Sequence, residues 1–312
     1  MQIVVLGAAA GGGFPQWNCY CEGCQAARNG DADTRTQASI AVSNDGETWF
    51  LVNASPDLRQ QINSTLSLHP QPSAGDNGVR HSPIAGVILT GADVDQIAGL
   101  LTLRESSPFT LWGTERILQT LKSNSIFNAL NPDFVTRKQI RIGTAFELTG
   151  TDGAASGLTA EPFAVPGKVA LYLEDESKGA DFGTVQDDTV GLCISDKASD
   201  KHVFLIPSCA AMSPELAERL RGADLVLFDG TVWHDDEMSA TNAGHKTGSR
   251  MGHMFMAGAG GSIEAFRELT VKRRVYIHIN NTNPVLRPGS SERATAEAAG
   301  WEIAEDGMEI TL

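Results

Sequence analysis

The chain has 312 residues, and 38 acidic against 24 basic side chains give it a formal net charge of −14. An apolar share of 41% and a charged share of 20% are typical of a folded globular protein and exclude a disordered one. The acidic balance argues against a nucleic-acid partner. Because there is no basic leader and no apolar run of about 18 residues, we expect a cytoplasmic protein without a membrane segment.

Taken in chain order, the sequence mixes short apolar strands with helices. Strands are expected at 2–6, 38–42, 49–52, 84–89, 109–112, 160–165, 170–173, 189–195, 202–206, 224–228 and 275–279. Helices are expected at 57–66, 97–104, 114–124, 213–221 and 262–268. Residues 71–78 are predicted to form a polar surface loop, and residues 301–312 an edge hairpin. This pattern predicts a mixed α/β fold.

Three of the five cysteines, Cys19, Cys21 and Cys24, form a C-x-C-x-x-C cluster. Three thiolates this close can take three corners of a tetrahedral zinc site, for which a histidine is the usual fourth ligand. Unrelated free thiols are the alternative. The distant Cys193 and Cys209 are expected to pack in the core, which disfavours an iron–sulfur cluster.

Asp93, Asp95 and Gln96 crowd the turn that follows the apolar strand 84–89. Strand ends are where α/β proteins place chemistry, and two carboxylates at this spacing can bind one cation. On spacing alone, helix capping by Asp93 and a favourable helix-dipole contact of Asp95 explain the same residues at least as well.

The stretch 91–96 resembles the metallo-β-lactamase superfamily, which is marked by H-x-H-x-D-H after a strand. Asp95 keeps the aspartate, Asp93 replaces one histidine, and the other two histidines are lost. Residues 165–168 and 206–209 depart from further ligand positions of the superfamily. The resemblance therefore implies the fold but not the dinuclear zinc centre of its hydrolases.

Blocks along the whole chain resemble the pyrroloquinoline quinone biosynthesis protein B family. They are residues 7–24, 53–59, 98–105, 229–231, 251–254, 278–284 and 300–310. The resemblance implies one four-layer αββα domain over residues 1–312 and a role in making the redox cofactor pyrroloquinoline quinone (PQQ). The chain departs from the family pattern at Gln96, where many members have histidine.

The same resemblance implies a reaction. In that pathway a cross-linked Glu–Tyr pair is excised from a precursor peptide, and the family hydroxylates its tyrosine ring with Fe(II) and O₂. An older assignment makes the family a carrier that helps PQQ or its precursor to reach the periplasm. The expected partner is thus a small Glu–Tyr-derived molecule. A homodimer and contacts with other PQQ-pathway proteins stay open.

His278 lies at the end of the strand 275–279, near a position where the superfamily has a metal histidine. In relatives with the C-x-C-x-x-C loop, a second histidine nearby closes the zinc site. This chain has only one histidine in this region, His278, and we expect it to be the fourth zinc ligand. An active-site role and a buried core histidine are the alternatives.

The expected catalytic centre consists of Asp93, Asp95, Gln96, Asp229, His234 and His253. Asp229 follows the buried strand 224–228, where a carboxylate is costly unless it is paired or ligates a metal. One or two histidines with carboxylates and open positions suit non-haem Fe(II). Surface or loop packing is the alternative for His234 and His253.

Three functions follow, in order of preference. The first is an iron-dependent oxygenase, whose substrate carboxylates would be met by Arg59, Arg104, Lys168 or Arg250. The second is a carrier that binds without turnover. The third is a hydrolase, which the loss of the histidine motif disfavours.

Overall fold

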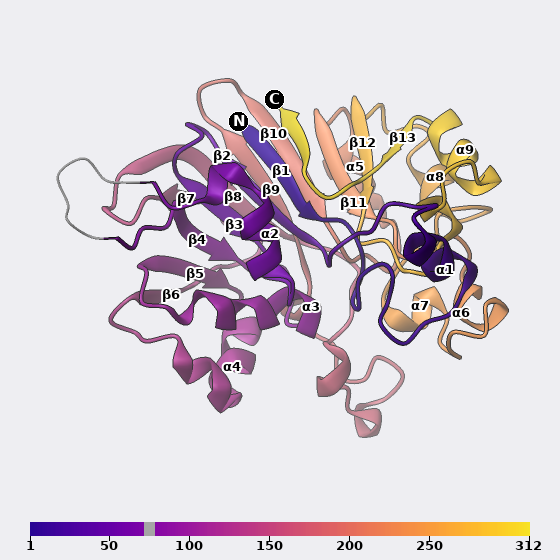
Figure 1. Cartoon of the computed structure of the whole chain (residues 1–312), viewed down its shortest axis with the longest axis horizontal. Helices are drawn as coiled ribbons and strands as arrows, with labels where there is room; N and C mark the ends of the chain where they lie inside the picture. The colour runs from indigo at the N-terminus through magenta and orange to yellow at the C-terminus, as the bar shows by residue number, and fades with distance from the viewer. Residues whose placement is uncertain (72–78) are drawn as a thin grey trace.

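The computed structural model describes residues 1–71 and 79–312, and it consists of two β-sheets packed face to face with helices outside them (Figure 1). Apart from its first residue, the loop predicted at 71–78 lies outside the described residues. The chain ends lie together, since the amino group of Met1 donates to the carbonyl of Leu312 at 3.1 Å.

The first sheet has seven strands in the described chain, in the order β14-β1-β2-β3-β4-β5-β6. They are β1 (Gln2–Gly7), β2 (Ser39–Ser43), β3 (Trp49–Val52), β4 (Ile84–Ile88), β5 (Phe109–Gly113), β6 (Val135–Gln139) and β14 (Met308–Thr311). Strands β3 to β6 are parallel. Buried on both faces, β3 and β4 are continuous apolar runs, as parallel strands under helices must be.

Within the described residues the second sheet also has seven strands, in the order β13-β12-β11-β10-β9-β8-β7. They are β7 (Phe146–Thr149), β8 (Ala155–Ala164), β9 (Val190–Asp196), β10 (Lys201–Ile206), β11 (Leu225–Asp229), β12 (Arg273–Ile277) and β13 (Trp301–Ile303). Strands β10 to β13 are parallel, and Asp229 pairs with Ile277 in register. The carboxyl ends of β11 and β12 therefore deliver Asp229 and His278 to the same edge of the sheet.

The helices in the described chain are mostly short, and several of them begin at a side-chain cap. They are α1 (Glu22–Asn29), α2 (Leu58–Ser64), α3 (Val94–Ile97), α4 (Glu115–Ser123), α5 (Pro214–Leu220), α6 (Glu237–Ala240), α7 (Gly248–Met251), α8 (Ser262–Ala265) and α9 (Ser291–Ala298). The Thr114 hydroxyl accepts from the backbone N–H of Ile117 at the start of α4, and Ser213 caps α5 in the same way. None of the described helices is long and apolar enough to span a bilayer.

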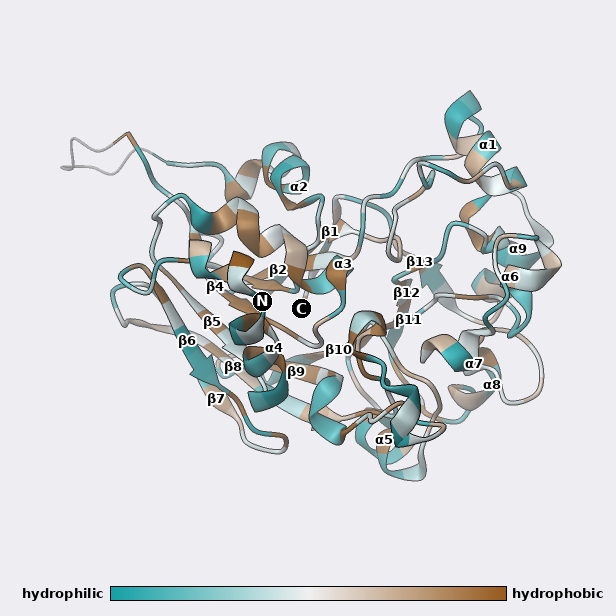
Figure 2. Ribbon diagram, turned by 90° about the horizontal axis from the view of Figure 1, so that it is seen from below, coloured by the Kyte–Doolittle hydropathy of each residue, from teal (hydrophilic) through white to brown (hydrophobic). Residues whose placement is uncertain are grey.

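Three apolar layers define the architecture, and Figure 2 shows the hydropathy of each residue along the ribbon. The middle layer, with Val5, Ile88 and Leu227, joins the inner faces of both sheets. A second layer lies between the first sheet and α2 and α4, through Leu58 and Leu121. The third lies outside the second sheet. Two sheets between two helical layers confirm the predicted α/β, four-layer αββα sandwich.

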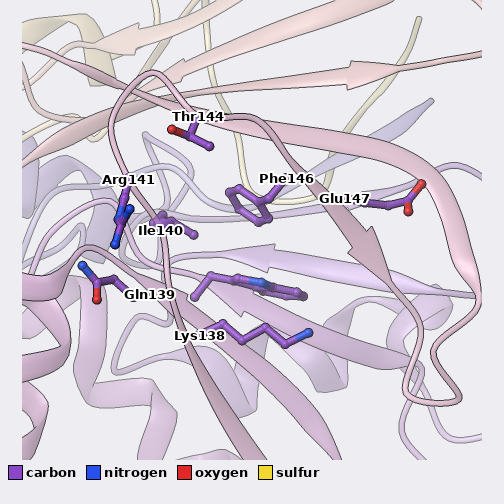
Figure 3. A pocket seen from close by; sticks show the side chains of 8 residues that line it. Lys138, Gln139, Ile140, Arg141, Thr144, Phe146 and Glu147 are labelled. Atoms are coloured by element: carbon purple, nitrogen blue, oxygen red, sulfur yellow. The ribbon is translucent and has the colours of Figure 1, made fainter.

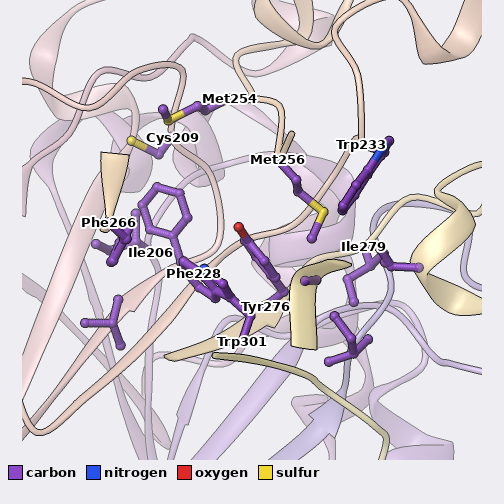
Figure 4. Packing of buried hydrophobic residues seen from close by; sticks show 14 of the residues in the cluster. Ile206, Cys209, Phe228, Trp233, Met254, Met256, Phe266, Tyr276, Ile279 and Trp301 are labelled. Atoms are coloured by element: carbon purple, nitrogen blue, oxygen red, sulfur yellow. The ribbon is translucent and has the colours of Figure 1, made fainter. Parts of the chain in front are cut away.

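Aromatic side chains fill the third layer (Figure 4). The rings of Tyr276 and Trp301 stack at 3.8 Å, and Phe266 from the turn after α8 meets Trp301 edge-on at 4.9 Å. Cys209 is fully buried here, and Cys193 packs half-buried against the layer. Both distant cysteines are thus packing residues, as the sequence predicts.

Two local predictions are wrong. Residues 301–312 do not form a hairpin, because β13 joins the second sheet while β14 crosses to β1 of the first. Residues 171–173 form a single 3-10 turn instead of a strand. The sequence reasoning also missed β6 and β7, since these edge strands are largely exposed and carry no clean apolar alternation.

Candidate metal centre

The three clustered thiols come together where the N-terminal loop enters α1. The sulfurs of Cys19, Cys21 and Cys24 all lie within 4.8 Å of one another. A tetrahedral zinc ion with Zn–S bonds of about 2.3 Å needs sulfurs roughly 3.8 Å apart, which this spacing allows. Burial raises the pKa of Cys24 to about 12, so metal binding would release its proton. The residues fit three corners of a zinc site.

His278 is not the fourth member of this cluster, and the sequence-based assignment is corrected here. The side chain that faces the thiols is Asn281, whose Nδ2 lies 3.2 Å from the sulfur of Cys19 and 3.3 Å from that of Cys24. Turning the amide by 180° would present its oxygen to a metal instead. His278 precedes Asn281 by three residues, and its imidazole contacts the other cluster.

The second cluster consists of Asp229, His253 and His278, whose ligand atoms also lie within 4.8 Å of one another. His253 Nδ1 lies 2.7 Å from Asp229 Oδ2, and the two imidazoles stack at 5.1 Å. The buried Thr231 hydroxyl donates to Asp229 Oδ1 at 2.6 Å and lies 2.9 Å from His278 Nδ1. Two histidines and one carboxylate are thus held on a buried polar scaffold.

Asp95 reaches this cluster from the first sheet. Its Oδ2 lies 2.8 Å from Nε2 of His278, across the two halves of the fold. Burial opposes ionisation of Asp95, but the hydrogen bond and charge of His278 outweigh it and lower the pKa of that carboxyl. Burial likewise opposes protonation of His278, yet Asp95 raises its pKa. In the structure the two side chains are hydrogen-bonded to each other, and a metal ion at this position would replace that contact.

Asp93 takes the capping role that was weighed as an alternative, and Gln96 shares it. They form a capping box at α3, in which the backbone N–H of Asp93 donates to Oε1 of Gln96 at 3.2 Å. Burial, followed by the charge of Asp95, raises the pKa of Asp93. Both residues nevertheless line the same cavity as Asp95, so capping and a place in the site coexist.

A cavity of about 500 Å³ opens over the second cluster. Its wall includes Asp95, His253 and His278 together with the cations Lys168 and Lys246. Gly11 lies beside Asp95, since a Cβ at residue 11 would be in ordinary van der Waals contact with Oδ2 of Asp95, at 3.6 Å. The glycine-rich loop after β1 is therefore part of this wall.

His234 lies outside the centre, which corrects its predicted role. Its side chain is exposed, and its ring lies 6.1 Å from that of Trp233. The strand β11 points Asp229 inward, but the chain turns to the surface before it reaches His234. Of the proposed cations, Lys168 lines the cavity and Arg250 lies beside it in the Glu174 pair described below, whereas Arg104 pairs with Glu105 at the surface.

A second cavity, of about 350 Å³, lies between the edge strands β6 and β7 (Figure 3). Its described lining includes Trp112, Lys138, Arg141 and Phe146, without a histidine, cysteine or aspartate. Glu147 is the one potential metal ligand among the described lining residues, so this cavity, unlike the one over the histidines, lacks a set of metal ligands.

Sequence reasoning missed Thr231, Asn281 and Glu237. Glu237 is buried beside the turn 278–283, where the Thr282 hydroxyl donates to it and the backbone N–H of Trp233 donates to it at 2.6 Å. Burial raises the pKa of Glu237 to about 7. Thr231 and Asn281 lie in the blocks 229–231 and 278–284 that carry the family resemblance, but no sequence spacing indicated their contacts.

Comparison with known proteins yields consistent matches. Residues 48–279 match the model of the β-lactamase superfamily domain. Coenzyme PQQ synthesis protein B of Bradyrhizobium diazoefficiens is 54% identical, and that of Gluconacetobacter diazotrophicus 53%, over 100% of this chain and 100% and 99% of theirs. The crystal structure of Zn²⁺-bound PqqB from Methylobacterium extorquens superposes with a TM-score of 0.93 at 48% identity, with full coverage of both chains.

Proposed function

We propose, because the chain belongs to the coenzyme PQQ synthesis protein B family within the β-lactamase superfamily, that it takes part in PQQ biosynthesis as an Fe(II)- and O₂-dependent hydroxylase. The substrate would be the tyrosine ring of a small Glu–Tyr-derived intermediate. A ring C–H would become C–OH, and the second oxygen atom would leave as water with two electrons and two protons from an external reductant.

One observation carries this proposal: the cluster of His253, His278 and Asp229 beneath an open cavity. Two histidines and one carboxylate are the ligand set of non-haem Fe(II) oxygenases, which leaves positions for substrate and O₂. The iron would supply O₂ activation. Asp95 would join the ligands or hold His278 in place, and Thr231 would fix the imidazoles through their Nδ1 atoms. The thiol cluster would hold a structural zinc.

The test is anaerobic reconstitution with Fe(II), followed by O₂ exposure with a cross-linked Glu–Tyr substrate and mass spectrometry. A gain of one oxygen atom, about 16 Da, that disappears in Asp95→Asn supports the hydroxylase. A ligand that binds without any change of mass would favour the carrier instead. The cytoplasmic location, the single domain over residues 1–312, the homodimer and the pathway partners stay predictions.

A further inference from the structure

The segment between β8 and β9 forms one wall of the cavity and is tied to the acidic turn. Leu171 and Tyr172 line the cavity. The backbone N–H of Leu171 donates to Oδ1 of Asp93 at 3.1 Å, and the Tyr172 hydroxyl donates to the carbonyl of Ala92 at 2.8 Å. This wall segment, residues 165–189, is thus fastened next to the candidate ligands.

Glu174, two residues further on, is clamped by two cations. Arg250 donates from its terminal nitrogens to both carboxylate oxygens, at 2.8 and 3.2 Å, and Lys168 also donates to Glu174. The three side chains are only 11 to 32% exposed. The hydrogen bond from Arg250, helped by Lys168, lowers the pKa of Glu174 to about 2, so the carboxylate is ionised at neutral pH.

An aromatic ring completes the clamp. The Arg250 guanidinium lies 3.8 Å from the ring centroid of Phe182, and the Lys168 ammonium lies 5.1 Å from it. Phe182 belongs to the same wall segment as Glu174. A bidentate guanidinium, a second cation and an aromatic face form a preorganised receptor for one carboxylate.

The receptor adjoins the cavity through Lys168, which belongs to both. The other charges on the cavity wall near the histidines are the carboxylates Asp93 and Asp95, which would repel an anionic ligand. Lys246 also lines the cavity. An anion that enters the cavity and binds Lys168 would therefore compete with Glu174, the carboxylate that already binds this lysine.

We propose that Lys168 and Arg250 form the subsite for a ligand carboxylate and that Glu174 occupies it until such a ligand displaces it. The ligand class is a small amino-acid-derived molecule with two or more carboxylates. One carboxylate replaces another on the same cations, and no covalent bond changes. When Glu174 is displaced, the wall segment loses its contacts with Lys168 and Arg250 and becomes more mobile next to the cavity. This inference rests on the proposed function, because it names how that site would select its substrate.

The test compares Glu174→Gln with the wild type by calorimetry under anaerobic conditions, on the full chain with its metals. The probe is the cross-linked glutamate–tyrosine diamino acid, and its fully esterified form, which has no carboxylate, serves as the control. If the wild-type subsite is open about 10% of the time, removing the competitor tightens binding about tenfold. We expect Lys168→Met to weaken binding about tenfold and the ester to respond to neither change. Glu147→Gln, at an exposed pair with Lys197, is the matched control and should have no effect.

Equal or weaker binding to Glu174→Gln overturns the proposal, and so does the absence of probe binding to both proteins. Hydrogen exchange provides a second readout that does not depend on a variant: the probe should speed exchange in residues 170–185 of the wild type, and slower exchange would contradict displacement. Because O₂ is absent, these results are independent of turnover. Tighter binding to Glu174→Gln without later oxygen incorporation would leave this inference standing and sink the hydroxylase.

Discussion

The two candidate metal sites of this fold are built in opposite ways. The thiol cluster takes three donors from six consecutive residues, Cys19 to Cys24. The histidine–carboxylate cluster takes its donors from the end of β11, the segment after α7, the end of β12 and, through Asp95, the opposite sheet. The thiol site needs only Asn281 from a distant part of the chain, whereas the second site exists only once both sheets have packed.

The two sites share one turn. His278 belongs to the second cluster, and Asn281, three residues later, contacts the thiols. Between them the backbone is unusual, since His278 has a φ of 57°, a left-handed conformation that costs about 1 kcal/mol or more in a non-glycine residue. Hydrogen bonds around the turn hold this conformation. We therefore expect the two sites to bind their metals independently, although both depend on the structure of the same turn.

The largest expected effect is on the thiol site. Cys24→Ser replaces a fully buried sulfur, and we expect loss of zinc together with a fall in the free energy of unfolding. The loss is about 4 kcal/mol when free zinc stands about 1,000-fold above its dissociation constant. Metal analysis and denaturant unfolding measure both quantities. Cys193→Ser, outside the cluster, is the control. Full zinc content in Cys24→Ser would show that the thiol cluster does not bind the zinc.

The shared turn should show a pH-dependent penalty at Glu237. Its pKa is raised from 4.5 to about 7 in the folded chain, so between these values the unfolded state ionises first and stability falls as the pH rises. Glu237→Gln removes this cost. The variant should gain up to roughly 3 kcal/mol over the wild type above pH 7, and little near pH 4.5.

Denaturant unfolding at pH 5 and pH 8, at constant metal content, measures this difference. Glu147→Gln, which changes an exposed carboxylate, should show no such trend. A Glu237→Gln variant with the same relative stability at both pH values would mean that the buried carboxyl is compensated at all pH values.

At the second site, Asp95→Asn should separate the two clusters. The amide cannot supply the negative charge that holds His278, and changes to groups that ligate or orient ligands typically weaken metal binding 10- to 100-fold. We expect iron affinity to fall about 100-fold while zinc in the thiol cluster is retained. Metal titration followed by elemental analysis tests both halves, and equal loss of both metals would show that the sites are not separable.

The contrast also explains what the sequence could predict. The C-x-C-x-x-C cluster is local, so its spacing alone indicated the grouping of the three thiols. Asp229 could be placed in the centre from its strand end and the cost of burial, and His253 was predicted to join it, but His278 was assigned to the other cluster. Its choice between two clusters depends on the register of β11 and β12 and on the left-handed backbone at residue 278, neither of which leaves a pattern in the sequence. His234, five residues after Asp229, was misplaced because the chain turns to the surface before it reaches this residue.

The smallest expected effect tests that correction directly. Asn281→Ala removes the amide that contacts all three sulfurs, and loss of one weak donor should cost the thiol site about tenfold in zinc affinity. The matched variant is His278→Ala, which should leave zinc affinity unchanged while it abolishes metal binding at the histidine–carboxylate cluster. A chelator competition at fixed pH measures both affinities. If His278→Ala instead loses zinc and Asn281→Ala does not, the histidine is the fourth ligand of the thiol site. The turn 278–281 would then have to bring residue 278, in place of residue 281, to the three sulfurs.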